Sequence, residues 1–335
     1  MSENNDYTPA PHYSNHGSFD NAYDAYTKST ARTYSSARNK GKTVTDLVLP
    51  SISTDAKVPI IVLVDGTGSM GLWPAKMFSK MPYLEHETHE YFGDDFEFAW
   101  GVIGDYISDT YWFGIRPFSS KEDIKKNLEE LVLEGNGGGD SHESYAHGAL
   151  YCARNVEMPN ATKPILIMIG DEGFHDRIGK DEAKVLNVDL GEEYSISGKE
   201  VFEELHRKFS CYLVRKPYYG NSFPDNLDDM SVGEKAIEGQ WKEVFPEDRI
   251  IRLPDADRVV DVLFGIFARE SGKIDYFKDE IEDRQRPDQV DTVYKALKTV
   301  HVDVIGDSND PPKMLKSGHS KLRGVSGGKK TKSLM

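Results

Sequence analysis

The sequence predicts an α/β fold: a doubly wound, mostly parallel sheet with one antiparallel edge strand and helices on both faces. Apolar runs without polar alternation, at residues 60–64 and 165–169, are typical of strands that are buried on both faces. Strand and helix patterns also alternate along the chain, as they do where crossover helices join parallel strands. Together these observations indicate a parallel sheet that is covered by helices.

The first part of the chain is expected to supply the centre and one edge of this sheet. A strand at residues 58–65 ends in a Gly-rich turn, and a helical pattern over residues 77–91 follows it. Two aromatic, β-prone runs, at residues 96–103 and 111–115, are separated by a short polar loop. This spacing predicts a hairpin, which provides the antiparallel strand.

The second part of the chain continues the alternation. A capping box at residues 120–123 starts a further helix, and a Gly-rich segment at residues 135–144 leads into another helix at residues 145–156. The strand at residues 164–170 ends in a carboxylate, as the first strand does. Beyond a polar stretch, helices and strands are expected to alternate at residues 199–209, 211–214, 233–244, 249–253 and 259–267.

Composition divides the chain into four parts. Residues 1–45 contain little aliphatic side-chain surface and predict a flexible N-terminal arm, although their tyrosines also suit an arm that packs on its own domain or on a partner. Residues 46–272 form the folded domain. Residues 273–310 are expected to be a charged C-terminal extension with a short helix, and residues 311–335 a basic, disordered tail.

Charge and cysteine content exclude several classes of function. The net charge of -15 argues against nucleic acid as the main partner, except through the basic C-terminal tail. Two cysteines in apolar segments do not suggest a disulfide framework and favour a reducing compartment. No apolar stretch resembles a signal peptide or is long enough to cross a bilayer, so we expect a cytoplasmic protein that does not contact membranes.

The turn after the first strand has two interpretations. Residues 66–71 match the G-x-G-x-x-G pattern of dinucleotide-binding folds. Alternatively, Asp65, Thr67 and Ser69 offer three oxygen ligands at alternate positions for a hard divalent cation. A carboxylate beside the first glycine repels a pyrophosphate and attracts a cation, so the charge of Asp65 favours the metal.

Two further segments are expected to complete this metal site. Ligands of doubly wound sheets bind beyond the carboxyl ends of the strands, where Asp65 and Asp171 both lie. The Gly-rich segment can bring Asp140 over the same crevice. The predicted ligands are therefore Asp65, Thr67, Ser69, Asp140 and Asp171, an all-oxygen set that suits Mg²⁺ or Mn²⁺.

This arrangement resembles von Willebrand factor A (vWA) domains with a metal-ion-dependent adhesion site (MIDAS). The first family motif, Asp-x-Ser/Thr-x-Ser, is matched by Asp65, Thr67 and Ser69, and the Asp that ends the fourth strand by Asp171. The family usually has a threonine where this chain has Asp140. The likeness spans about residues 58–269, and its motifs are similar to those of stand-alone bacterial and bacteriophage vWA proteins.

The resemblance implies a non-enzymatic interaction module. In such domains the metal accepts a carboxylate from a partner protein, and in intracellular bacterial members that partner is often an AAA+ ATPase, which suggests an adaptor or assembly factor. A third carboxylate at Asp140 is expected either to weaken the pull of the metal on an acidic partner or to make the site structural.

Two alternatives remain open from the sequence. His142, His147 and His175 lie near the predicted crevice, and a metal-dependent hydrolase of phosphoesters could use one of them as a general base. Asp105 follows a predicted strand and suits either the outer shell of the metal or an ordinary turn. The second alternative is a structural protein that self-assembles through its N-terminal arm.

Overall fold

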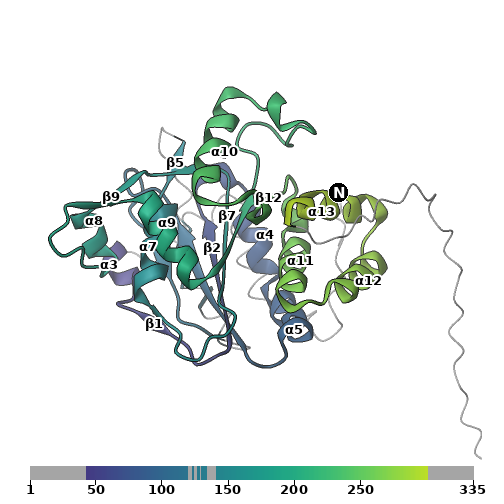
Figure 1. The fold of residues 1–335 in the computed structure, drawn as a ribbon, viewed down its shortest axis with the longest axis horizontal. Helices are drawn as coiled ribbons and strands as arrows, with labels where there is room; N and C mark the ends of the chain where they lie inside the picture. The colour runs from purple at the N-terminus through teal and green to yellow at the C-terminus, as the bar shows by residue number, and fades with distance from the viewer. Residues whose placement is uncertain (1–42, 120–122, 124–126, 129, 134–140, 301–335) are drawn as a thin grey trace, which may run out of the picture. The chain divides into compact units, whose positions relative to one another are not determined.

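A computed structural model describes residues 43–119, 123, 127–128, 130–133 and 141–300. Its centre is a six-stranded sheet (Figure 1). All neighbouring strands in this sheet are parallel except the last pair, β3 and β4, which is antiparallel. In spatial order the strands are β12 (Ile250–Arg252), β11 (Ser210–Arg215), β7 (Ile165–Gly170), β2 (Val58–Asp65), β3 (Phe96–Ile103) and β4 (Phe113–Ile115).

Helices cover both faces of the sheet (Figure 1). One hydrophobic cluster lies between the sheet and five helices: α4 (Trp73–Ser79), α5 (Met81–Phe92), α11 (Val259–Ser271), α12 (Ile274–Arg284) and α13 (Pro287–Leu297). A second cluster lies between the other face and four helices: α7 (Tyr145–Asn155), α8 (Lys180–Val185), α9 (Gly198–Lys208) and α10 (Val232–Val244). The prediction of a mixed α/β fold with a mostly parallel central sheet is confirmed.

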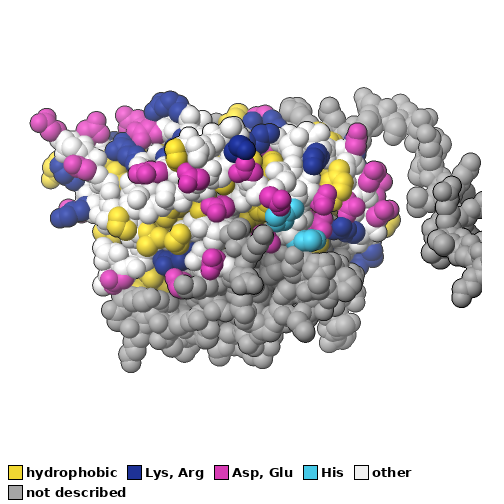
Figure 2. All heavy atoms as spheres, turned by 90° about the horizontal axis from the view of Figure 1, so that it is seen from below, with side chains coloured by type: hydrophobic (Ala, Val, Ile, Leu, Met, Phe, Trp, Pro, Cys, Tyr) yellow, Lys and Arg dark blue, Asp and Glu magenta, His cyan; other side chains and the backbone are white. Residues whose placement is uncertain are grey.

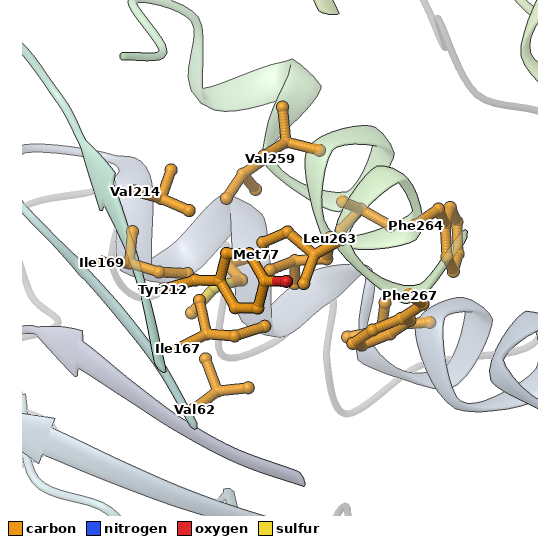
Figure 3. Packing of buried hydrophobic residues seen from close by; sticks show 14 of the residues in the cluster. Val62, Met77, Ile167, Ile169, Tyr212, Val214, Val259, Leu263, Phe264 and Phe267 are labelled. Carbon is orange, nitrogen blue, oxygen red and sulfur yellow. The ribbon is translucent and has the colours of Figure 1, made fainter. Parts of the chain in front are cut away.

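The central strands are apolar throughout because both of their faces are buried. Successive side chains of a strand point to opposite faces, so Val62 belongs to the first cluster and Leu63 to the second. Figure 3 shows part of the first cluster, which joins Val62, Ile167 and Tyr212 of the sheet to Leu263 of α11. Cys152 and Cys211 are both free and buried.

Small elements that periodicity did not reveal surround the central sheet. A short helix, α3 (Val44–Leu47), precedes β1. The polar stretch at residues 174–197 contains two antiparallel strands, with α8 between them in the sequence, that bury Ile178 and Ile196. The short strand pairs are β1 (Ile52–Ser53) with β6 (Val156–Glu157), β5 (His142–Glu143) with β8 (Gly173–Phe174), and β9 (Arg177–Gly179) with β10 (Ser195–Ser197).

Two predicted helices differ in the structure. The single helix expected over residues 77–91 is divided at Lys80 into α4 and α5, since Pro82 in the first turn of α5 has no N–H to continue the hydrogen-bond ladder. Residues 273–300 contain two helices instead of one. Phe277 of α12 and Val293 of α13 are buried in the first cluster, so this extension packs on the domain.

Several other predictions lie outside the described residues. They are the arm up to residue 42, the tail from residue 301 and most of the helix expected after residue 120. Within the part of the chain that is described, no helix is both long and apolar enough to cross a membrane.

Candidate metal centre

The predicted ligands Asp65 and Asp171 lie at the point where the winding of the sheet reverses. From β2 the chain proceeds to β3 and β4 on one side, and then returns through α7 to β7 on the other side of β2. Val64 of β2 pairs with Ile169 of β7, so the two strands end level with each other. Ligands of doubly wound folds bind at this position.

Four of the five predicted ligands form one chain of contacts. The Thr67 hydroxyl donates to Asp65 Oδ1 at 2.5 Å, and the Ser69 hydroxyl donates to Asp171 Oδ1 at 3.0 Å. The two hydroxyl oxygens are 3.1 Å apart. The backbone N–H of Thr67 also donates to Asp65 Oδ1, which holds the turn in place. The fifth predicted ligand, Asp140, lies outside the described residues.

The chemistry of these donors fits a small divalent cation. The Thr67 and Ser69 hydroxyl oxygens lie within hydrogen-bond distance of each other. Each also lies within hydrogen-bond distance of a carboxylate oxygen, Asp65 Oδ1 for Thr67 and Asp171 Oδ1 for Ser69, so four oxygens are contiguous. Adjacent ligands of an octahedral Mg²⁺ are about 2.9 Å apart. Among the described residues no three His, Cys, Asp or Glu side chains converge on a metal position, so the site depends on the two hydroxyls as well as on its carboxylates.

Both carboxylates are fully buried, which makes their joint ionisation unfavourable. Burial and the neighbouring charge of Asp171 raise the pKa of Asp65 to about 7, against hydrogen bonds from Thr67 and Tyr145. Burial also raises the pKa of Asp171, against the opposing charge of Lys216. A divalent cation would offset the repulsion between these two groups.

Tyr145 on α7 is a site residue that the sequence did not reveal. Its hydroxyl donates to Asp65 Oδ2 at 2.5 Å, and its side chain is fully buried. Burial and the nearby carboxylates raise its pKa well above the ordinary value, so the hydroxyl stays protonated and remains a donor. A Cβ on Gly170 would lie 1.6 Å from the Tyr145 hydroxyl oxygen. A glycine inside an apolar strand is the sequence signal for such a close approach.

Lys216 is the second residue that the sequence did not reveal. It follows β11, the neighbour of β7, and its ammonium donates to Asp171 Oδ2 at 2.7 Å. The guanidinium of the preceding Arg215 donates its hydrogen bonds to Glu234 and Glu238 instead of to Asp171. A lysine directly after a parallel strand was a usable signal, but the strand order was needed to place it.

Glu143 of β5 is a further buried acid close to the site. Its side chain is 1% exposed, and Oε2 has no hydrogen-bond partner among the described residues. Burial, followed by the charges of Asp65 and Glu172, raises the pKa of Glu143 to about 11. The Glu143 carboxyl is therefore neutral at pH 7 when no cation is bound.

The three histidines are grouped beside the next strand end. His175 Nε2 lies 2.9 Å from Asp105 Oδ1, which supplies the orienting carboxylate that the sequence did not identify. The His175 ring is 6.0 Å from that of His142 and 6.2 Å from that of His147. His147 is fully buried, and burial lowers its pKa, so it is neutral at pH 7.

The opposite side of the domain has a different character. β5 and α10 lie at the top of Figure 1, and Figure 2 views the domain from below. There the described Asp and Glu side chains are intermixed with Lys, Arg and apolar side chains.

Comparisons with known proteins leave the family open. No family model and no curated protein matches the sequence. Two crystal structures of the pilus adhesin SpaC from Lactobacillus rhamnosus GG, one in an open conformation, are 11% identical to this chain, with TM-scores of 0.42 and 0.43. They match 65% and 68% of this chain, which in turn covers 31% of the adhesin.

Proposed function

We propose that this protein is a vWA-like, metal-dependent protein interaction module of the MIDAS type. Its ligands for Mg²⁺ or Mn²⁺ are Asp65, Thr67, Ser69, Asp140 and Asp171. The observation that supports this most directly is the 3.1 Å separation of the Thr67 and Ser69 hydroxyl oxygens, which also contact the carboxylates of Asp65 and Asp171. Hydroxyl and carboxylate oxygens that are grouped in this way are the ligands that Mg²⁺ prefers.

The proposed role follows from the coordination that Mg²⁺ prefers. A hard cation with six positions is not saturated by the five proposed ligands, and water fills what remains. A carboxylate from another protein can replace such a water. We propose a cytoplasmic, non-enzymatic adaptor or assembly factor, for which an AAA+ ATPase is a candidate partner by resemblance alone.

A second candidate function is supported by the pair formed by Asp105 and His175. A histidine that a buried carboxylate orients is the usual form of a general base, and this pair lies at the strand end next to Asp65. A phosphoester hydrolase would show turnover with Mn²⁺ that His175→Gln abolishes. Turnover that survives this substitution would remove the candidate.

The first experiment measures metal binding directly. Chelator-treated protein is titrated with Mn²⁺ in a calorimeter, and thermal unfolding is followed with and without Mg²⁺. Binding to the folded state should raise the free energy of unfolding by about 2.7 kcal/mol at a hundredfold excess over the dissociation constant. Ser69→Ala should weaken binding, whereas Ser108→Ala, which removes a hydroxyl that donates to Asp105, should not.

The second experiment tests the partner. Wild-type protein and Asp65→Asn are used as baits in the native host, with and without EDTA. Partners that depend on the metal should be lost in EDTA and from the variant. Recovery of the same partners in every arm would contradict a metal-dependent interaction, and self-association that persists in EDTA would favour the structural alternative.

A further inference from the structure

Lys216 places a positive charge directly on a candidate metal ligand. Its ammonium donates to Asp171 Oδ2 at 2.7 Å and to the carbonyl oxygen of Pro217 at 3.2 Å. Its backbone N–H donates to the carbonyl of Gly170 at 2.9 Å, which fixes the start of this segment beside the end of β7. The Lys216 side chain is 18% exposed, whereas that of Asp171 is fully buried.

Both oxygens of Asp171 are engaged in this arrangement. Oδ1 accepts from Ser69, and Oδ2 accepts from Lys216. The ammonium is therefore the counter-ion that directly contacts this buried carboxylate. The charge of the neighbouring Arg215 also favours the ionised form of Asp171, but less than that of Lys216, and its hydrogen bonds go to Glu234 and Glu238.

We propose that Lys216 is the resident counter-ion of the candidate metal centre and that a divalent cation binds by exchange with it. A cation that approaches Asp171 meets an ammonium already bound to the same carboxylate, and the two positive charges repel each other. Metal binding therefore has to displace the ammonium or share the carboxylate with it. This inference rests on the proposed metal site.

Exchange predicts effects of opposite sign on the two states of the protein. Without metal, Lys216 stabilises the fold, since it compensates Asp171. When the metal binds, the positive charge of Lys216 repels it, so removal of that charge should tighten metal binding. The expected change is roughly tenfold, a typical size for the coupling between two sites. A purely structural role predicts instead that removal weakens both the fold and metal binding.

The test compares Lys216→Met with two controls. Lys216→Arg keeps the charge, and Lys242→Met removes an ammonium that contacts a different buried carboxylate, Glu238. Mn²⁺ is titrated into chelator-treated protein in a calorimeter, and urea unfolding is measured in EDTA. Lys216→Met should bind Mn²⁺ roughly tenfold more tightly than wild type and have a lower urea midpoint. Both controls should bind Mn²⁺ as wild type does.

The outcomes separate this inference from the proposed function. If wild type binds Mn²⁺ and Lys216→Met binds it equally or more weakly, the exchange is wrong and the metal site stands. If wild type does not bind Mn²⁺, the metal site itself is wrong and the exchange falls with it. Lys216→Gln, which keeps a polar side chain without the charge, decides the question by the same criterion if Lys216→Met does not fold.

Discussion

Gly170→Ala tests the close approach that orders the candidate metal centre. Gly170 is the last residue of β7, and a Cβ at this position would lie 1.6, 2.5 and 2.8 Å from the Oη, Cζ and Cε1 atoms of Tyr145. Real Cβ atoms essentially never come within 3.0 Å of another heavy atom. The Tyr145 ring must therefore move, and its hydroxyl must leave Asp65.

The cost has two parts that add. Forcing a methyl group into a closely packed interior costs about 1–3 kcal/mol. Losing a hydrogen bond to a charged group, here between Tyr145 and Asp65, costs about 1.5–3 kcal/mol. The free energy of unfolding should fall by roughly 2.5–6 kcal/mol, a large part of the roughly 5–15 kcal/mol that stabilises a typical domain.

Urea unfolding at pH 8 in EDTA measures this loss without any contribution from metal. Gly239→Ala is the matched control, because Gly239 is an exposed residue of α10 and a Cβ added to it would meet no described atom within 4 Å. That change should stabilise the protein by about 0.5–1 kcal/mol, as expected for Ala in a helix interior. If Gly170→Ala alters the free energy of unfolding by less than about 1 kcal/mol while the control behaves as expected, the approach of Tyr145 to Gly170 is refuted.

Three further predictions concern single side chains. Tyr145→Phe keeps the ring but removes the donor to a ligand, so Mn²⁺ affinity measured by calorimetry should fall roughly 10- to 100-fold; unchanged affinity would contradict a positioning role. Arg215→Met removes the ion-pair partner of the buried Glu234 and one of the partners of the buried Glu238, so it should lower the free energy of unfolding in urea by about 3–5 kcal/mol, whereas a loss below about 1 kcal/mol would show that the network is dispensable. Burial raises the pKa of Asp261 from 3.8 to about 6, against the opposing charges of Arg258 and Lys80. The folded protein then holds a proton between about pH 4 and 6 that the unfolded chain has released, so this contribution to stability is present below pH 4 and is lost as the pH rises through 6. The free energy of unfolding of wild type, measured in urea relative to that of Asp261→Asn, should therefore fall by about 2–3 kcal/mol from pH 4 to pH 7. A difference that does not change with pH would refute the raised pKa.

The sequence predicted the parts of the fold that depend on local pattern. β2 and β7 are apolar runs; β2 ends in Asp65, and Asp171 directly follows β7. The predicted metal site required these two strands to be neighbours, and the structure pairs them, which brings Asp65 and Asp171 together. Periodicity was less informative at Lys80, where one apparent helix is two.

Residues whose roles depend on strand order could not be found in the same way. Tyr145 is 80 positions from Asp65, and Lys216 is 45 positions from Asp171. The local sequence around Tyr145 looks like that of any core tyrosine, and the local sequence around Lys216 like that of any loop lysine. It does not show that these side chains contact the proposed metal ligands Asp65 and Asp171. His175 was noticed, but its partner Asp105 lies at another strand end 70 positions away.

The strand order also has a consequence for synthesis of the chain. β2 lies in the middle of the sheet, yet its partner on one side, β7, is about a hundred residues later in the sequence. At a translation rate of about 5–20 residues per second, one apolar edge of β2 has no strand beside it for roughly 5–20 s. An unpaired edge of this kind is open to pairing with other chains. The nascent protein is therefore expected to need protection from aggregation during the interval before residues 165–170 emerge from the ribosome.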